Sequence, residues 1–143
     1  STPTPLPTRQ PTDTPLPVPT APPLRYVQAQ GPEFYPNTNP LITIWVKVFA
    51  SPNVPLAGRE VRITRDGSEV VRLESEAQFR KTNPSADFGF FADANLKFES
   101  QDLGAATWRL CLVEGDTCVS PEIEFTVSPD NINRIVYVAF RAN

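Results

Sequence analysis

Apolar residues recur at every second position in several short runs of this chain, which is the spacing of a β-strand with one buried face. The clearest run is LITIWVKVFA, in which Ile42, Ile44, Val46 and Val48 share one side. Similar runs cover residues 59–65, 68–75, 106–114, 122–127 and 133–142. Because no segment has the period of an amphipathic helix, the pattern predicts an all-β body of about seven or eight strands, arranged as an antiparallel sandwich.

Glycine and proline mark the connections between these runs. Asp66 and Gly67 lie between two runs and predict a tight hairpin. Residues 77–100 are rich in phenylalanine and contain Asn83-Pro84, which indicates irregular loops between short strands. For residues 24–40 we expect a short edge strand and then a loop, with Phe34 able to dock on the edge of the domain.

Residues 1–23 have a different organisation from the rest of the chain. They contain nine prolines and six threonines and no aromatic residue. Proline lacks a backbone donor and restricts the residue before it, so neither a helix nor a sheet can run through this segment. We expect residues 1–23 to form an extended arm or linker, and residues 24–143 to form a single domain.

The composition excludes several kinds of function. The chain has no histidine, which excludes histidine-dependent catalytic triads and histidine-ligated metal sites. Its formal net charge of -3 gives no broad basic field, so we expect no nucleic-acid partner. No run approaches the roughly 20 apolar residues that a membrane-spanning helix needs, so we expect no transmembrane segment.

The two cysteines lie close together in WRLCLVEGDTCVSPEIEF. Six residues separate Cys111 from Cys118, and the EGDT between them is typical of a turn, so a hairpin would bring the sulfurs to facing positions. The alternatives are a reduced pair in a cytosolic protein or half of a zinc site, for which the spacing is wide and histidine is missing. We expect a disulfide, and with it an extracellular or cell-surface location.

The same hairpin has two distinct faces. Alternation places Trp108, Leu110 and Leu112 on one face together with Val119, Ile123 and Phe125 of the partner strand. On the opposite face it places Arg109 and Cys111 with Glu122 and Glu124. An ion pair between Arg109 and these glutamates would lie on the surface and contribute at most about 1 kcal/mol.

Two segments, TIWVKVFASPNVPLAGREVRITRDGSEVV and LGAATWRLCLVEG, resemble the prealbumin-like sandwiches of carboxypeptidase regulatory-like domains and collagen-adhesin B-type repeats. Trp108 stands at the aromatic place of the family's GxYxL pattern, and the resemblance covers about residues 41–127. It implies an immunoglobulin-like or prealbumin-like sandwich in a bacterial surface protein. The adhesin repeats carry an isopeptide bond, and Lys47 falls near its lysine. Leu112 departs from the pattern, which has a glutamate there, so we interpret Lys47 as a solvated residue.

The Thr-Pro tracts resemble the stalks of bacterial surface proteins, in which closely spaced threonines carry O-linked sugars. The candidate O-glycosylation sites are Thr2, Thr4, Thr8, Thr12, Thr14 and Thr20. No sequon for Asn-linked sugars is usable, since NTN lacks the hydroxyl residue and NPS contains the forbidden proline.

The chain offers no catalytic constellation. Asp87, Asp93 and Glu99 surround the phenylalanine-rich segment, but no loop has the density of carboxylates that calcium requires. The chain contains neither a GxSxG elbow nor a cysteine-histidine pair. We therefore predict that the protein is not an enzyme and needs no metal or cofactor.

Two classes of function remain. The first is an extracellular structural or interaction protein, self-assembling into a filament or layer, with assembly contacts at Leu6, Leu16, Val18 and Tyr26. The second is a carbohydrate-binding or accessory module of a secreted enzyme, with binding aromatics at Trp45, Tyr35, Phe90 and Phe91. A simpler interpretation of these rings is that residues 24–40 cover them.

Overall fold

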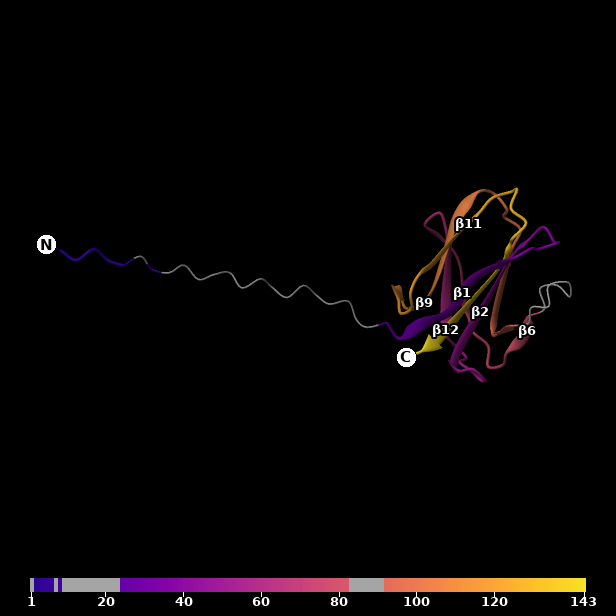
Figure 1. Ribbon diagram of the computed structural model, residues 1–143, viewed down its shortest axis with the longest axis horizontal. Helices are drawn as coiled ribbons and strands as arrows, with labels where there is room; N and C mark the ends of the chain where they lie inside the picture. Colours follow the sequence, from indigo (N-terminus) through magenta and orange to yellow (C-terminus); the bar gives the residue numbers. More distant parts are fainter. Residues whose placement is uncertain (1, 7, 9–23, 83–91) are drawn as a thin grey trace.

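The computed structural model describes residues 2–6, 8, 24–82 and 92–143, and all of the helix or strand structure in them is β-strand (Figure 1). The strands are β1 (Tyr26–Tyr35), β2 (Ile42–Ser51), β3 (Val54–Pro55), β4 (Glu60–Arg65), β5 (Ser68–Glu74), β6 (Arg80–Thr82), β7 (Ala92–Ala94), β8 (Leu96–Ser100), β9 (Ala106–Glu114), β10 (Thr117–Cys118), β11 (Ile123–Val127) and β12 (Ile135–Ala142). Eight of them have five or more residues. The prediction of an all-β body is confirmed.

Two main sheets form the body. The first sheet has the order β1-β12-β2, with β8 and β3 both pairing with the far side of β2. The second sheet has the order β5-β4-β9, with β11 and β10 both pairing with the far side of β9. A small third sheet joins β6 and β7. The predicted hairpin at Asp66-Gly67 is confirmed, since both residues have the positive φ that a two-residue hairpin turn requires.

The inner faces of the two sheets enclose the main core, as the alternation predicted. Ile42, Ile44, Val46 and Val48 of β2 are fully buried and belong to one cluster with the inward residues of the second sheet. Those residues are Val61, Ile63, Trp108, Leu110, Leu112, Ile123, Phe125 and Val127. Burying each aliphatic side chain contributes about 1.5–3 kcal/mol, so this core is the main stabilising feature of the body.

The prediction of a wholly antiparallel arrangement is wrong at one strand pair. β12 pairs with β2 in parallel, with Ile135 opposite Thr43 and Arg141 opposite Phe49. The chain reaches β12 from β11, which lies in the other sheet, so β12 is not joined to β2 by a hairpin and its direction is set by that crossing. Alternation predicts which face of a strand is buried, but it carries no information about strand direction.

The edge strand expected to be short within residues 24–40 is ten residues long, because β1 continues through Gly31 and Pro32. Two register shifts between Gln28 and Glu33 absorb them, and β1 still pairs antiparallel with β12 at both ends. Gly31 has a φ of 85°, and a Cβ at this position would lie 2.3 Å from the carbonyl oxygen of Tyr137. β1 lies at the edge of its sheet, where a strand tolerates proline and bulges.

The outer face of the first sheet carries a second, smaller hydrophobic cluster. All residues from Ile135 to Phe140 of β12 are buried, so this strand is covered on both sides. Phe49, Tyr137 and Ala139 pack there against Ala94 of β7, with Phe79 and Trp45 partly buried beside them. Residues 24–40, which were expected to cover these rings, form β1 of the same sheet rather than a separate layer over it, and of their side chains Tyr35 packs against this cluster.

The two ends of the body differ. At one end, the N–H of Asn143 donates to the carbonyl of Arg25 at 2.9 Å, so the C-terminus lies beside the point where residues 1–23 join the body (Figure 1). We call this the arm end. At the opposite end of β1, the loops before β2 and before β12 meet, with the N–H of Asn37 donating to the carbonyl of Ile132 at 2.9 Å. We call this the loop end.

Among the described residues, no helix has the length and apolarity that a membrane crossing needs.

Candidate functional site

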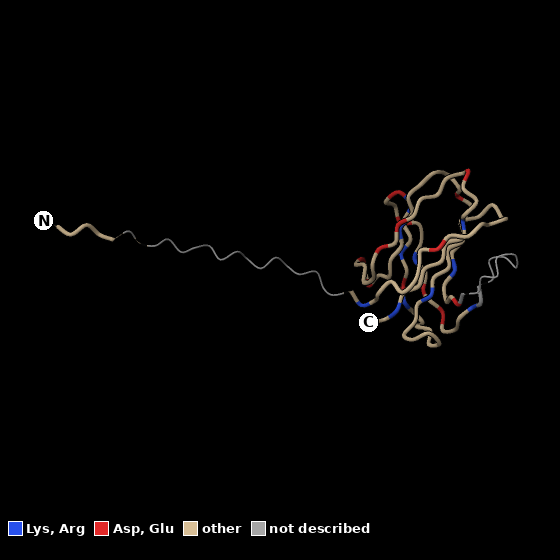
Figure 2. Tube along the Cα trace, in the orientation of Figure 1, with Lys and Arg blue, Asp and Glu red and all other residues tan. Residues whose placement is uncertain are grey.

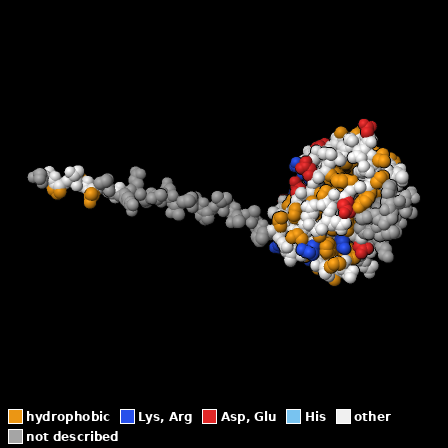
Figure 3. All heavy atoms as spheres, viewed as in Figure 1, with side chains coloured by type: hydrophobic (Ala, Val, Ile, Leu, Met, Phe, Trp, Pro, Cys, Tyr) orange, Lys and Arg blue, Asp and Glu red, His pale blue; other side chains and the backbone are white. Residues whose placement is uncertain are grey.

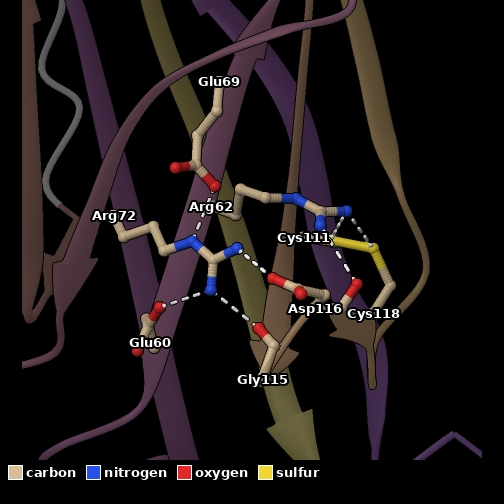
Figure 4. Close-up of polar contacts among 8 residues, drawn as sticks. All are labelled: Glu60, Arg62, Glu69, Arg72, Cys111, Gly115, Asp116 and Cys118. Carbon is tan, nitrogen blue, oxygen red and sulfur yellow. Dashed lines mark hydrogen bonds and ion pairs between the residues drawn. A yellow bond between two sulfur atoms is a disulfide. The ribbon is translucent and has the colours of Figure 1, made fainter.

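The outer face of the second sheet is held by a network of ion pairs centred on Arg72 of β5 (Figure 4). Its guanidinium lies 2.6 Å from Glu69, 3.1 Å from Glu60 and 2.7 Å from Asp116, and it donates to the carbonyl of Gly115 at 2.7 Å. The hydrogen bonds to Glu69, Asp116 and Glu60 raise the pKa of Arg72, so the group stays protonated at any physiological pH. This network ties β4 and β5 to the turn after β9.

The disulfide between Cys111 and Cys118 lies beside this network and confirms the sequence prediction. The two Cα atoms are 5.8 Å apart, but the residue directly opposite Cys118 in the sheet is Val113, so the cysteines are diagonal neighbours rather than facing ones. Cys111 lies on the outer face as expected, yet it is only 1% exposed. The guanidinium of Arg62 covers the bridge, with Nη2 lying 3.4 Å from the sulfur of Cys118 (Figure 4).

The charged groups of this face are used to hold the sheet together. Arg109 lies 3.8 Å from Glu122 and 3.6 Å from Glu124, as the alternation of the cysteine hairpin predicted. Figure 2 shows acidic and basic residues interspersed over the body, with neither sign forming a field of its own. The face offers paired charges and a covered disulfide, and such groups stabilise a surface without supplying a reactive atom.

Within the described residues, one group of three side chains has its ligand atoms close enough together to hold a metal ion, namely Cys111, Cys118 and Glu122. Both sulfurs are already bonded to each other, and a metal requires the free thiolate. Of the acidic residues singled out from the sequence, Glu99 pairs with Lys97 at 2.7 Å, Asp93 lies in β7, and Asp87 lies outside the described residues. The disulfide therefore rules out this group as a metal site while it is oxidised.

The outer face of the first sheet brings aromatic rings and lysines together. The ammonium of Lys97 lies 4.8 Å from the ring centroid of Trp45. The ammonium of Lys47 lies 4.6 Å from the ring of Phe49 and 5.0 Å from that of Phe79. Lys47 is thus half-buried over two rings rather than solvated, and such contacts contribute about 0.5–1 kcal/mol each.

Two tyrosines of this face have raised pKa values. Burial, with a hydrogen bond from its hydroxyl to Glu33 at 2.7 Å, raises the pKa of Tyr35 to about 12. Burial also raises the pKa of Tyr137, whose hydroxyl donates to the carbonyl of Asp93 at 3.0 Å, and the charge of Asp93 adds to the shift. Both hydroxyls remain protonated near neutral pH and act as hydrogen-bond donors.

The two predicted aromatic binding residues that the structure describes lie on this face. Trp45 and Tyr35 are half-buried and pack against the small hydrophobic cluster. The other two, Phe90 and Phe91, lie outside the described residues. The described part of the face is therefore a partly covered aromatic surface and not an open row of rings.

A groove opens along the edge of the body where β1 of the first sheet lies over β11 of the second. We call it the edge groove; it is lined by Phe34, Glu124, Phe125, Thr126, Asn131 and Asn133 and has a volume of about 580 Å³. The rings of Phe34 and Phe125 meet edge to face with centroids 6.2 Å apart. Phe34 is 44% exposed, and Ile132, between the two asparagines in sequence, is 60% exposed.

The rim of the edge groove is held in place by Arg134. Its guanidinium donates to the carbonyl of Asn131 at 3.2 Å, and to the carbonyls of Asn37 and Asn39 at 3.0 and 2.9 Å. The N–H of Asn133 donates to the side-chain oxygen of Asn131 at 2.9 Å. These bonds fix the loop before β12, so the groove is preformed at the loop end.

Sequence reasoning identified only part of this site. It placed Phe34 at the domain edge and Phe125 in the core, and both positions agree with the structure. It missed Asn131, Ile132 and Asn133, although an isoleucine between two asparagines in a polar loop is a signal that could have been followed.

The predicted sites in and near the arm are only partly described. Thr2, Thr4, Leu6 and Thr8 are exposed, whereas Thr12, Thr14, Leu16, Val18 and Thr20 lie outside the described residues. Tyr26 is 6% exposed and belongs to the main core, so its side chain is not on the surface as an assembly contact would be.

Comparison with known proteins gives no relative for this chain. No family model matches the chain, no curated protein matches it, and no solved structure matches it. The resemblance to prealbumin-like domains therefore stays an expectation from short sequence patterns.

Proposed function

We propose that this protein is a non-catalytic, extracellular interaction module that assembles with copies of itself, and that residues 1–23 act as a spacer or tether in the assembly. The observation that carries the proposal is the exposed ring of Phe34 in the edge groove, together with the exposed Ile132 in the loop whose asparagines line that groove. Exposed apolar groups around a preformed hollow are typical of protein-binding surfaces.

The extracellular location is supported by the disulfide. Bonds of this kind persist in oxidising compartments and are rare in the cytosol. The sulfurs are shielded by Arg62, and the bond joins neighbouring strands of the second sheet, as in a permanent structural bridge. The proposal therefore places the protein outside the cell or at its surface.

The fold we propose within the two expected classes is the prealbumin-like one. In an immunoglobulin constant domain, the sheets are antiparallel and the first and last strands lie in different sheets. Here the first and last long strands, β1 and β12, lie in the same sheet, and β12 pairs with β2 in parallel. This arrangement favours the prealbumin-like alternative over the immunoglobulin-like one.

Sedimentation velocity over a range of protein concentrations tests the assembly. We expect the average mass to rise with concentration. A protein that remains monomeric up to millimolar concentration would contradict the proposal. Intact mass of material purified from its natural source tests the other parts: we expect a mass deficit of two hydrogens for the disulfide, and added hexose units if the arm threonines are glycosylated.

A second candidate function, binding of carbohydrate, is favoured by one observation. Trp45 presents a half-buried indole on the outer face of the first sheet, with the Lys97 ammonium over its ring. Aromatic rings of this kind stack on sugars. Glycan-array binding that is lost in Trp45→Ala and kept in Val70→Ala, a control on the other sheet, would favour this candidate; a silent array would reject it.

A further inference from the structure

We propose that the edge groove is the receiving site for the proline-rich arm, residues 1–23, of a neighbouring copy of this chain. This inference rests on the proposed self-assembly and names the two surfaces that meet. Hydrophobic side chains are scattered over the face of the body seen in Figure 3, and the edge groove differs from them in its aromatic ring and its polar rim.

The edge groove has the chemistry that binds a proline-rich segment. Proline-rich chains dock in shallow grooves lined by aromatic rings, because proline packs on a ring face and the extended chain loses little entropy on binding. Phe34 supplies such a ring, and Phe125 supports it from below at 6.2 Å. Of the six large hydrophobic residues exposed in the described chain, only Phe34 is aromatic.

The polar rim matches the backbone and the charge of the arm. A proline-rich chain has carbonyl oxygens without internal partners, and the amides of Asn131 and Asn133 are suitable donors at the rim. Near the groove, the carboxylates of Glu122 and Glu124 are balanced by Arg109 and by Arg134 at the rim. The arm likewise carries one cation and one anion, Arg9 and Asp13, so neither surface has a net charge that would repel the other.

The position of the groove favours a neighbour's arm over the chain's own. The arm joins the body at the arm end, while Phe34 and Asn131 lie at the loop end. The N–H groups of Arg25 and Tyr26 both donate to the carbonyl of Val119, at 2.9 and 3.2 Å, which fixes the direction of the chain as it enters β1. The chain's own arm would have to reverse its direction to lie in the groove, which a semi-rigid proline-rich segment resists, whereas an extended arm of this length reaches roughly 70 Å and meets the next body without a reversal.

A contact between the arm of one copy and the groove of the next joins two different surfaces. Such a contact leaves one free arm and one free groove after every addition. Repeated without ring closure, it produces an open, head-to-tail chain of bodies, as expected of a filament subunit.

Three sets of full-length variants test the inference. The groove variant carries Phe34→Ser and Ile132→Ser, and Ile132→Arg alone serves if loss of Phe34 disturbs folding, since position 132 is exposed. The arm variant carries Leu16→Ser and Val18→Ser. The matched control carries Val54→Ser and Val70→Ser, which remove two exposed apolar side chains away from the groove. Thermal unfolding checks that each variant folds.

In sedimentation velocity, we expect the control to associate like the wild type. We expect the groove variant and the arm variant each to weaken the apparent association constant at least tenfold. A mixture of these two variants retains one intact arm and one intact groove, so it should form a one-to-one dimer and nothing larger.

The other outcomes overturn the inference in distinguishable ways. If the groove variants associate like the wild type, the groove is not the receiving site, while the proposed self-assembly stands. If the wild type is monomeric under all conditions, the proposed function fails as well. If the wild type is monomeric and the arm variant shifts the NMR signals of Phe34 and Asn133, the groove holds the chain's own arm, which also overturns the inference.

Discussion

Asn95 shows how much one polar residue can contribute to this body. It lies between β7 and β8, is completely buried, and accepts a hydrogen bond from the N–H of Val48 at 2.7 Å. Its side-chain amide faces the carbonyls of Val48, Leu56 and Glu76 at 2.9–3.1 Å. The side chain thus joins β2 to two loops that are distant in sequence.

We predict that Asn95→Ala lowers the free energy of unfolding by about 3 kcal/mol, because it leaves several buried backbone groups without partners. Urea denaturation followed by tryptophan fluorescence measures the change. Asn53→Ala, in the exposed turn after β2, is the control and should lie within about 0.5 kcal/mol of the wild type. Equal effects of the two substitutions would contradict this role for Asn95.

The raised pKa values of two tyrosines predict how the free energy of unfolding depends on pH. Folding raises the pKa of Tyr35 to about 12 and also raises that of Tyr137, mainly through burial. A raised pKa means that the folded state resists deprotonation of these tyrosines. Their contribution to the free energy of unfolding is therefore fully present below about pH 10, the ordinary pKa of tyrosine, and is lost as the pH rises above it.

We therefore expect the melting temperature to fall between pH 10 and pH 12 and to fall less steeply in Tyr137→Phe, which has no hydroxyl to ionise. At pH 7 the same variant should be slightly less stable, by about 1 kcal/mol, because the bond to the Asp93 carbonyl is lost. Absorbance at 295 nm reports the ionisation directly. If the melting temperatures of the wild type and of Tyr137→Phe fall equally steeply above pH 10, the role given to Tyr137 is contradicted.

At the scale of single elements, β1 depends on a glycine for its pairing with β12. Gly31 and Gly67 have nearly the same φ, 85° and 83°, but only Gly31 has an atom close to the place of a Cβ. We predict that Gly67→Ala costs about 1 kcal/mol for backbone strain alone, and that Gly31→Ala costs at least about 2 kcal/mol more because of the Tyr137 carbonyl. Denaturant unfolding of both variants checks the difference.

The elements also show what the sequence could and could not predict. Period-two alternation correctly predicted the inward residues of β2, β4, β9 and β11, because each of these strands has one face against the core. It could not predict the second hydrophobic cluster, since Tyr137 and Ala139 are covered by residues far away in sequence. The edge groove escaped prediction for the same reason: Phe34 and Asn131 are brought together by pairing that no local pattern records.

For the whole molecule, we predict that the two chain ends contribute unequally to stability. Removing residues 1–23 should change the free energy of unfolding by no more than about 0.5 kcal/mol, because residues 2–6 and 8, the arm residues that the structure describes, are exposed. Removing residues 135–143 should prevent folding, because β12 pairs with both β1 and β2. Circular dichroism and thermal unfolding of the two truncations measure the contrast; a cooperative transition in the second would contradict it.

The place of β12 between β1 and β2 also has a consequence for biosynthesis. A ribosome makes β1 and β2 early, yet the strand that lies between them is translated after every other described strand of this body. Until then β1 lacks the strand with which it pairs, and the nascent polypeptide cannot close the first sheet. Such long-range closure slows folding, so the body is expected to reach its final form only after translation has supplied its C-terminal strand.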